Sequence, residues 1–291
     1  MLALLHRRGV QAKLVQSMDG LRFLNLAEVR YFLRCVDLGG KAAKSPLISD
    51  EVWTVAKSKT FSKYAVSSSL AYLRRCLQLF EQTSHAKYYS DFREFVFESS
   101  VEDFCDVSGA GLVVSTIHKA KGWEFDHVVM LVSVPVCLSD EVLRRYYVAM
   151  TRAKQTLTIH TDGKLFDGIY ADSHISDGKV YAMPNEIVLQ LSYKDVNLGF
   201  SKNCKLDILA LYGGASLIYH DHRFSVPSTG RDIAMLSQKM QEKLGKWEAK
   251  GYHVTVAKIR FIVAWKPKGA PKEEEESAVP LIDLVMRKGF R

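Results

Sequence analysis

The chain has 291 residues, of which 47% are hydrophobic and 25% are charged. This is the balance of a globular protein with enough apolar residues for two domains, and no apolar run is long enough to span a membrane as a helix. The net charge of +8 leaves two interpretations open, a solvated basic surface or a polyanionic partner. The five cysteines lie far apart without a CxxC pair, so we expect neither a metal site nor a redox pair. Scattered thiols and the lack of a signal peptide favour a cytoplasmic protein.

The first hundred residues are predicted to be mainly helical. A helix should end at Gly9, a strand should follow over residues 10–17, and Asn25 is a candidate cap for a helix over 26–40. Residues 62–98 show apolar positions at helical spacing. We expect the aromatic side chains there to form core rather than to stack on nucleic-acid bases.

Residues 112–160 have a different pattern. Two apolar runs, 112–117 and 127–136, read as buried strands, and a helix over 140–154 precedes a strand over 155–160. A strand, loop, strand, helix and strand in this order is typical of an α/β core with a parallel sheet.

After about residue 178 short strands and turns dominate. Strands are predicted at 186–193, 207–219 and 253–265, with an amphipathic helix over 232–251. The pattern predicts a small β-rich domain, so we divide the chain at 180/181, with the helical segment at about 48–100 inside the first domain. The basic and aromatic residues 258–268 favour a half-buried strand, and a base-stacking surface is the alternative.

The first stretch with candidate chemistry covers residues 113–131. Polar and basic groups follow its first strand, at the end where open α/β sheets bind ligands. Gly122 would allow close approach of the backbone, and Glu124 is an acceptor suited to a sugar hydroxyl. Taken singly, His118 could equally be a loop histidine and Glu124 a surface charge.

The second stretch covers residues 140–159. Arg145, Ala149 and Arg152 fall on one side of the expected helix because steps of four and three residues return to the same face. This pattern fits either a solvated basic face or an arginine directed at a phosphoryl group, whose charge and geometry suit a guanidinium.

Taken together, the two stretches resemble motifs V and VI of superfamily 1A DNA helicases of the UvrD, Rep and PcrA type. The family's motif V, T-x-H-x-x-K-G-L-E-F, is matched by Thr116, His118, Lys121, Gly122, Glu124 and Phe125, with Trp123 in place of leucine. Motif VI, R-R-L-x-Y-V-A-x-T-R-A-K, is matched by Tyr147, Val148, Ala149, Thr151, Arg152, Ala153 and Lys154, and the arginine pair Arg144 and Arg145 stands one position later than in the family pattern. The strong resemblance covers about residues 110–160.

The resemblance implies a RecA-like second motor domain of the P-loop NTPase fold, followed by the β-rich domain. It implies that Arg152 is an arginine finger on the γ-phosphate and that Glu124, beside Gly122, binds the nucleotide ribose. It places Thr116, His118 and Lys119 on single-stranded DNA. Arg145 and Tyr147 would support motif VI from behind.

The family's other half-site is not found in this sequence. None of its Gly-Lys pairs stands in the phosphate-loop pattern G-x-x-x-x-G-K-[ST], and Asp140-Glu141 is followed by Arg144 where the magnesium motif D-E-x-x-Q requires glutamine. Asp140 and Glu141 instead suit the first turn of a helix. We therefore expect ATP and Mg²⁺ to be shared with an N-terminal RecA-like motor domain, either in the same longer chain or in another subunit, and we expect no ATPase activity from this chain alone.

Two functions of different classes remain. The first is the C-terminal motor domain of an ATP-dependent DNA helicase, which acts in DNA repair or a related process. The alternative is a non-catalytic DNA-binding or protein-docking module that keeps the fold. A helicase–nuclease subunit is disfavoured, because the tail has no convincing cluster of carboxylates and lysine.

Overall fold

The computed structural model describes most of the chain. The described residues are 5, 8–10, 12–15, 22–40, 46–105, 111–120, 122–133, 138–178, 182–266 and 276–289. Within them no helix is long and apolar enough to cross a membrane.

The first part is helical. It contains the short strand β1 (Ala12–Leu14), the 3-10 helices η1 (Phe23–Asn25) and η2 (Glu102–Phe104), and the α-helices α2 (Ala27–Gly40), α3 (Asp50–Lys63), α4 (Leu70–Thr83) and α5 (Tyr89–Glu98). The side chain of Ser49 caps α3 by accepting from the Val52 amide at 3.3 Å. Phe80 and Phe92 are 2% or less exposed and lie 5.0 Å apart, so these aromatic side chains form core as expected.

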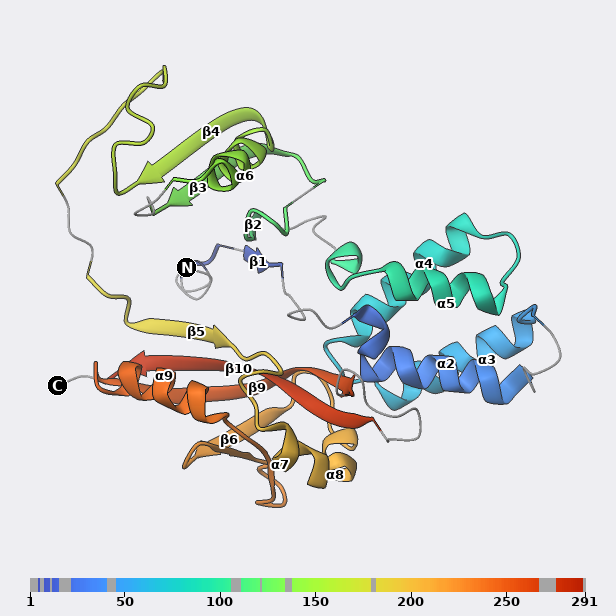
Figure 1. The fold of residues 1–291 in the computed structure, drawn as a ribbon. Coiled ribbons are helices and arrows are strands. Elements are labelled where there is room, and N and C mark those ends of the chain that lie inside the picture. Colours follow the sequence, from blue (N-terminus) through green and yellow to red (C-terminus); the bar gives the residue numbers. More distant parts are fainter. Residues whose placement is uncertain are drawn as a thin grey trace.

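The middle part is a mixed α/β unit. It contains β2 (Leu112–Val114), β3 (Phe125–Val132), α6 (Asp140–Met150) and β4 (Ala153–Thr161). β1 pairs with β2 in parallel and β3 pairs with β4 in parallel, so the pairing is parallel as predicted, but these strands form two two-stranded sheets rather than one sheet. Figure 1 shows α6 lying along β3 and β4, and its Ala149 packs with Met130 and Val132 in a small core.

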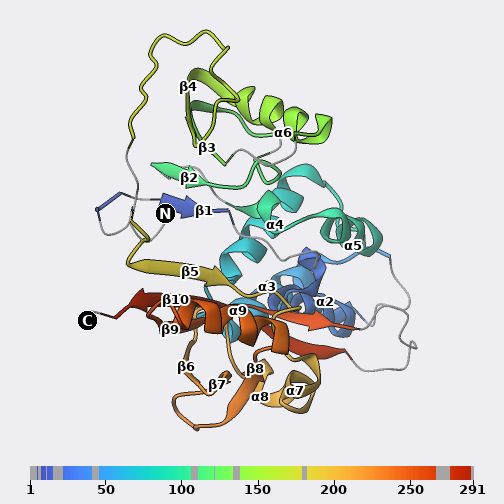
Figure 2. The same cartoon turned by 60° about the vertical axis from the view of Figure 1, so that its left-hand side comes forward.

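The last part is a curled antiparallel sheet in the order β5-β10-β9-β6-β7-β8. Its elements are β5 (Glu186–Gln190), α7 (Leu198–Asn203), α8 (Lys205–Leu209), β6 (Ser216–His220), β7 (Arg223–Ser225), β8 (Asp232–Met235), α9 (Gln238–Glu248), β9 (Tyr252–Trp265) and β10 (Ser277–Lys288). Two bulges interrupt the long pairing of β9 with β10. Figure 2 shows β1 and β2 lying between this sheet and the β3–β4 pair.

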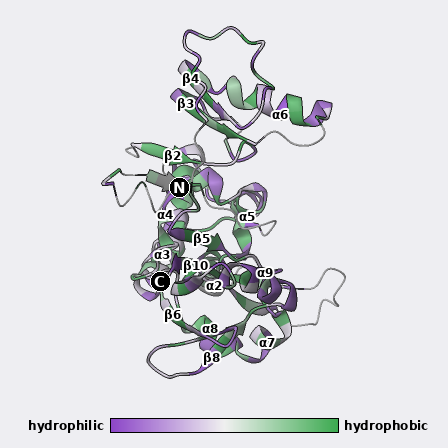
Figure 3. Ribbon diagram, turned by 90° about the vertical axis from the view of Figure 1, so that its left-hand side faces the viewer, coloured by the Kyte–Doolittle hydropathy of each residue, from purple (hydrophilic) through white to green (hydrophobic). Residues whose placement is uncertain are grey.

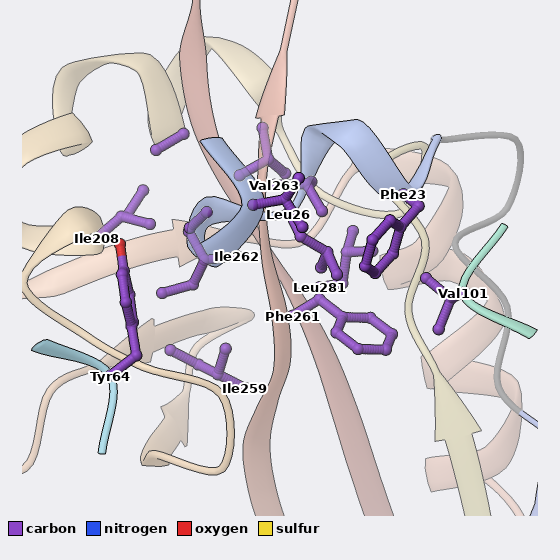
Figure 4. Packing of buried hydrophobic residues seen from close by; sticks show 14 of the residues in the cluster. Phe23, Leu26, Tyr64, Val101, Ile208, Ile259, Phe261, Ile262, Val263 and Leu281 are labelled. Carbon is purple, nitrogen blue, oxygen red and sulfur yellow. The ribbon is translucent and has the colours of Figure 1, made fainter. Parts of the chain in front are cut away.

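The helical segment and the antiparallel sheet share one core. In Figure 4, Phe23 and Leu26 of the helical part lie near Phe261 and Val263 of β9. Tyr64, also from the helical part, lies beside Ile259 of β9. The small core of β3, α6 and β4 is separate from it. The boundary at 180/181 stays a prediction, but the helical segment inside the expected first domain packs on the C-terminal sheet.

Several local predictions need correction. Residues 207–209, expected in a strand, belong to helix α8, and the expected helix over 232–251 begins only at Gln238 because β8 occupies 232–235. Asn25 is the last residue of η1, so the residue just before α2 is Leu26 and not the predicted cap Asn25. Leu26 is fully buried and forms an isolated antiparallel β-bridge with Val263. Ile259 to Val263 are all buried, so this part of β9 is covered on both faces and cannot stack bases.

Two expected elements fall partly or wholly outside the described residues. Of the helix expected at 1–9, only residues 5, 8 and 9 are described, and Gly9 has a φ of 73°, typical of a glycine that ends a helix. The charged, proline-containing stretch 266–277 is predicted from its composition to be an exposed loop, and its residues 267–275 lie outside the described residues.

A buried polar network joins the helices to the sheet. Glu28, 2% exposed, accepts through Oε1 from the hydroxyls of Ser67 at 2.7 Å and Ser69 at 2.6 Å. The Ser67 hydroxyl in turn accepts from the Gly213 amide at 3.1 Å. A Cβ at Gly213 would lie 2.5 Å from Ser69 Oγ and 3.2 Å from the Arg260 carbonyl oxygen, so only glycine fits.

Gly213→Ala should therefore lower the free energy of unfolding by about 1–3 kcal/mol, the usual cost of overpacking a core. Gly245→Ala is the matched control, because nothing lies within 4 Å of its Cβ position and the residue is inside α9. Loss of backbone entropy in the unfolded chain should make that variant about 0.5–1 kcal/mol more stable. Urea unfolding measures both, and equal shifts in the two variants would contradict the packing argument.

A second prediction concerns Asp283, whose Oδ1 lies 3.1 Å from Nε of the buried Arg260. Burial raises the pKa of Asp283 to about 6, although Arg260 and Gln190 act to lower it. Between about pH 6 and 4 the folded chain then holds a proton that the unfolded chain has released, so acidification stabilises the fold. When the pH is lowered from 7 to 4, the free energy of unfolding of the parent should rise relative to that of the Asp283→Asn variant. Parallel stability curves for the two proteins would show that Asp283 does not titrate in this range.

Candidate ATP-site half and DNA-contact loop

Glu124 and Arg152 occupy equivalent positions on neighbouring strands. Glu124 immediately precedes β3, and Arg152 immediately precedes β4. Because the two strands are parallel and paired from Phe125 and Ala153 onward, both residues lie at the same end of the sheet. This is the amino end of β3 and β4, and among the predicted site residues only Thr116, His118 and Lys119 follow the carboxyl end of a strand, β2.

The end of α6 is tied directly to the start of β3. The Phe125 amide donates to the Arg152 carbonyl at 2.9 Å, and Arg152 Nη1 donates to the Trp123 carbonyl at 3.4 Å. Arg152 Nε donates to the Val148 carbonyl at 3.0 Å, and Nη2 donates to the Thr151 hydroxyl at 3.2 Å. These bonds fix a half-buried guanidinium at the corner where the two motifs meet.

Two features make this corner accessible. Gly122 has a φ of 85°, which L side chains rarely adopt, and an added Cβ would meet nothing within 4 Å. Glu124 is 58% exposed, and its Oε2 lies 3.5 Å from Lys154 Nζ. The carboxylate of Glu124 and the backbone at Gly122 are thus both accessible beside Arg152.

The loop after β2 presents the remaining predicted residues. The Thr116 carbonyl accepts from the amides of Lys119 at 3.0 Å and Ala120 at 3.2 Å, so a tight turn displays this segment. Thr116 and His118 are exposed, whereas Lys119 is half-buried and forms an ion pair with Glu102 of η2. Lys121 lies outside the described residues.

Helix α6 shows how the acidic residues at its start and the basic residues near its end are placed. The Ser139 side chain and the acids Asp140 and Glu141 are at its amino end, which confirms that this acidic pair starts a helix. Ala149, on the expected common face with Arg145 and Arg152, is buried, so this face lies against the sheet rather than in solvent.

The two residues expected to support motif VI from behind differ from each other. Arg145 has a buried Nε, and its Nη2 lies 3.7 Å from Glu141 Oε1. Tyr147 is 68% exposed, so it packs behind nothing in this part of the chain, and that expectation is wrong.

Sequence reasoning missed the partners of three predicted residues, Glu124, Arg152 and Lys119. It did not foresee the Lys154–Glu124 pair or the Trp123 carbonyl as an acceptor for Arg152. The signal was present in the two strand starts, because aligning Phe125 with Ala153 places Lys154 two residues past the position beside Glu124, and residues two apart on a strand share a side. The Glu102–Lys119 pair joins residues 17 apart and gave no local signal.

The Glu102–Lys119 pair generates a prediction about DNA. Glu102→Gln removes the carboxylate that holds Lys119, so a phosphate no longer competes with it for the ammonium group. Affinity for a single-stranded oligonucleotide at low salt should rise by about 2–5-fold, the size of one partly exposed ion pair. Glu94→Gln, an exposed change of equal charge on α5, should have no comparable effect. Fluorescence anisotropy measures both, and equal affinities would remove Lys119 from the proposed DNA contact.

Comparison with known protein families gives one match. The model of the UvrD-like helicase C-terminal domain matches residues 47–163. No curated protein and no solved structure shows a significant match to the chain. The matched segment includes helices α3 to α5 as well as the unit from β2 to β4, so it extends well before the stretch recognised from motifs V and VI. The segment 47–163, in which Arg152 and Glu124 meet where the two motifs are joined, thus resembles a UvrD-like helicase C-terminal domain.

Proposed function

We propose that this chain supplies the second RecA-like half of an ATP-dependent DNA helicase motor, with Arg152 as its arginine finger. The observation that carries the proposal is the corner at which motif VI is bonded to motif V through the Arg152 backbone and guanidinium. A finger must be held at a fixed place relative to the groups that contact the rest of the nucleotide. The two bonds between residues 123–125 and Arg152 provide that coupling.

Arg152 suits a transferring phosphoryl group for three reasons. Its guanidinium keeps its charge at any working pH and offers five N–H donors in a planar fork. Its present bonds go to two carbonyls and a hydroxyl, which are neutral acceptors that a phosphate oxygen can displace. No carboxylate competes for it among the ion pairs of the described residues.

Glu124 and Gly122 would contact the sugar side of the nucleotide. The exposed carboxylate of Glu124 can accept from a ribose hydroxyl, and Lys154 holds it in place. Gly122 leaves room for close approach of the backbone. ATP phosphates and Mg²⁺ would be held by the N-terminal motor domain, since the Gly-Lys pairs of this sequence do not stand in the phosphate-loop pattern.

The DNA track would run over the loop after β2. Thr116 and His118 are exposed there and can donate to phosphate oxygens, and Lys119 can join them when it leaves Glu102. ATP binding would close the two motor halves, and hydrolysis would reopen them. Because one segment carries both the DNA loop and the nucleotide corner, closure would alternate the grip on single-stranded DNA.

The test is a change of Arg152 in a motor that contains the phosphate-loop domain. Arg152→Ala and Arg152→Lys should each lower DNA-stimulated kcat by about 3–5 decades, because lysine keeps the charge but loses the fork. Single-stranded DNA binding without nucleotide should stay close to that of the parent. Lys164→Ala, an exposed cation just after β4, is the matched control and should stay within about threefold.

A kcat within about threefold of the parent in both Arg152 variants amounts to less than 1 kcal/mol and would reject the finger. If the restored motor hydrolyses no ATP even with Arg152 intact, the non-catalytic DNA-binding or protein-docking module becomes the better account.

A further inference from the structure

Helix α9 carries a row of lysines that the motor role does not use. Lys239, Lys243, Lys246 and Lys250 are spaced by four, three and four residues, and all four are exposed. Such steps return a helix to the same side, and Ala249 keeps helical dihedral angles past the last residue of α9, so the row is continuous. Figure 3 shows α9 as strongly hydrophilic.

The opposite side of α9 is fixed to the sheet. Met240 and Leu244 are 2% exposed or less, and Trp247 lies edge-on to the buried Tyr252 with ring centroids 5.6 Å apart. α9 packs on β9, so the helix cannot rotate its lysines inward. The row is therefore a rigid edge, which we call the α9 lysine row.

The charge on this face is not neutralised within the fold. Among the described residues none of the four lysines has an ion-pair partner, although Lys250 Nζ lies 5.0 Å from the Trp247 ring centroid. Glu242 is the one acid of α9 that is exposed near the row, and Glu248 is half-buried. Four cations beside a single exposed acid repel one another, and a polyanion relieves that repulsion.

We infer that the α9 lysine row binds the phosphate backbone of double-stranded nucleic acid, as a contact separate from the motor. Lysine is a point charge without a bidentate fork, so it suits phosphates rather than base edges. The row is about 16 Å long at 1.5 Å per residue, which is enough to follow several successive phosphates. Single strands are bound on exposed aromatic platforms, and the aromatic ring of α9, Trp247, is instead packed against Tyr252.

The inference goes beyond the proposed function and does not require it. The row belongs to the antiparallel sheet domain, whereas Arg152 and the loop after β2 belong to the matched segment 47–163. In a motor on a junction, a duplex contact here would hold the double-stranded region while the other surface handles the single strand.

The experiment measures binding of the full chain to a fluorescent 20-base-pair duplex over a series of salt concentrations. Changing all four lysines to glutamine should lower affinity at low salt at least tenfold and reduce the slope of log K against log salt by about 3–4, at about 0.9 per phosphate contact. Glutamine has nearly the helix propensity of lysine, so α9 should persist, and circular dichroism checks this. The four lysine-to-arginine changes keep the charge and should keep the slope.

The matched control removes the same charge from scattered exposed positions, by changing Lys59, Arg75, Arg93 and Lys164 to glutamine. It should alter duplex affinity by less than about threefold, because the proposed effect depends on the row and not on net charge. An unchanged slope in the α9 variant, or an equal loss in the scattered control, would overturn the inference. Tighter binding of polyglutamate than of duplex by the parent would overturn it in favour of an acidic protein partner. Because Arg152 is intact in every variant, none of these results bears on the motor assignment.

Discussion

Parallel pairing of β3 with β4 is the constraint on which the proposed site depends. Two parallel strands joined by a crossover helix begin at the same end of the sheet, so the residues just before each strand must meet. Here those residues are Glu124 and Arg152. The bond from the Phe125 amide to the Arg152 carbonyl then continues the sheet pairing by one residue, and the guanidinium reaches the Trp123 carbonyl. Two segments that are remote in the sequence become one corner because of backbone geometry, not because of a large core.

The small core beneath this corner contrasts with the rest of the chain. Three residues of β3 and α6 are buried there, whereas the helical segment and the antiparallel sheet form one extensive core. Val129 and Leu131, on the other face of β3, are 60% and 59% exposed. Stability thus lies mainly in the part without predicted catalytic residues. In the proposed motor, which would close and open against its partner, this division would be an advantage, because a small unit can shift while the large core stays intact.

The sequence proposed candidate site residues but not the packing. Residue order and spacing in 113–131 and 140–159 were enough to propose Arg152, Glu124 and the loop from Thr116, because a motif is a local property, and the roles of these residues stay predictions. The Glu28 network with Ser67 and Gly213 joins positions more than 140 residues apart and has no local signature. The expected strand at 207–219 was wrong for a related reason, since its first residues form α8 against β10. Tertiary contacts override local propensity at such positions.

The most direct measurement of the central claim compares two nucleotide states in a motor with its phosphate-loop domain. ADP with aluminium fluoride mimics the charge of the transferring phosphoryl group, whereas ADP alone does not. If Arg152 acts on that charge, Arg152→Ala should weaken binding of the fluoride complex by at least about 100-fold and leave ADP affinity within about threefold. Equal affinity of parent and variant for the fluoride complex would contradict the account, because Arg152 would then contribute nothing to the state it is proposed to stabilise.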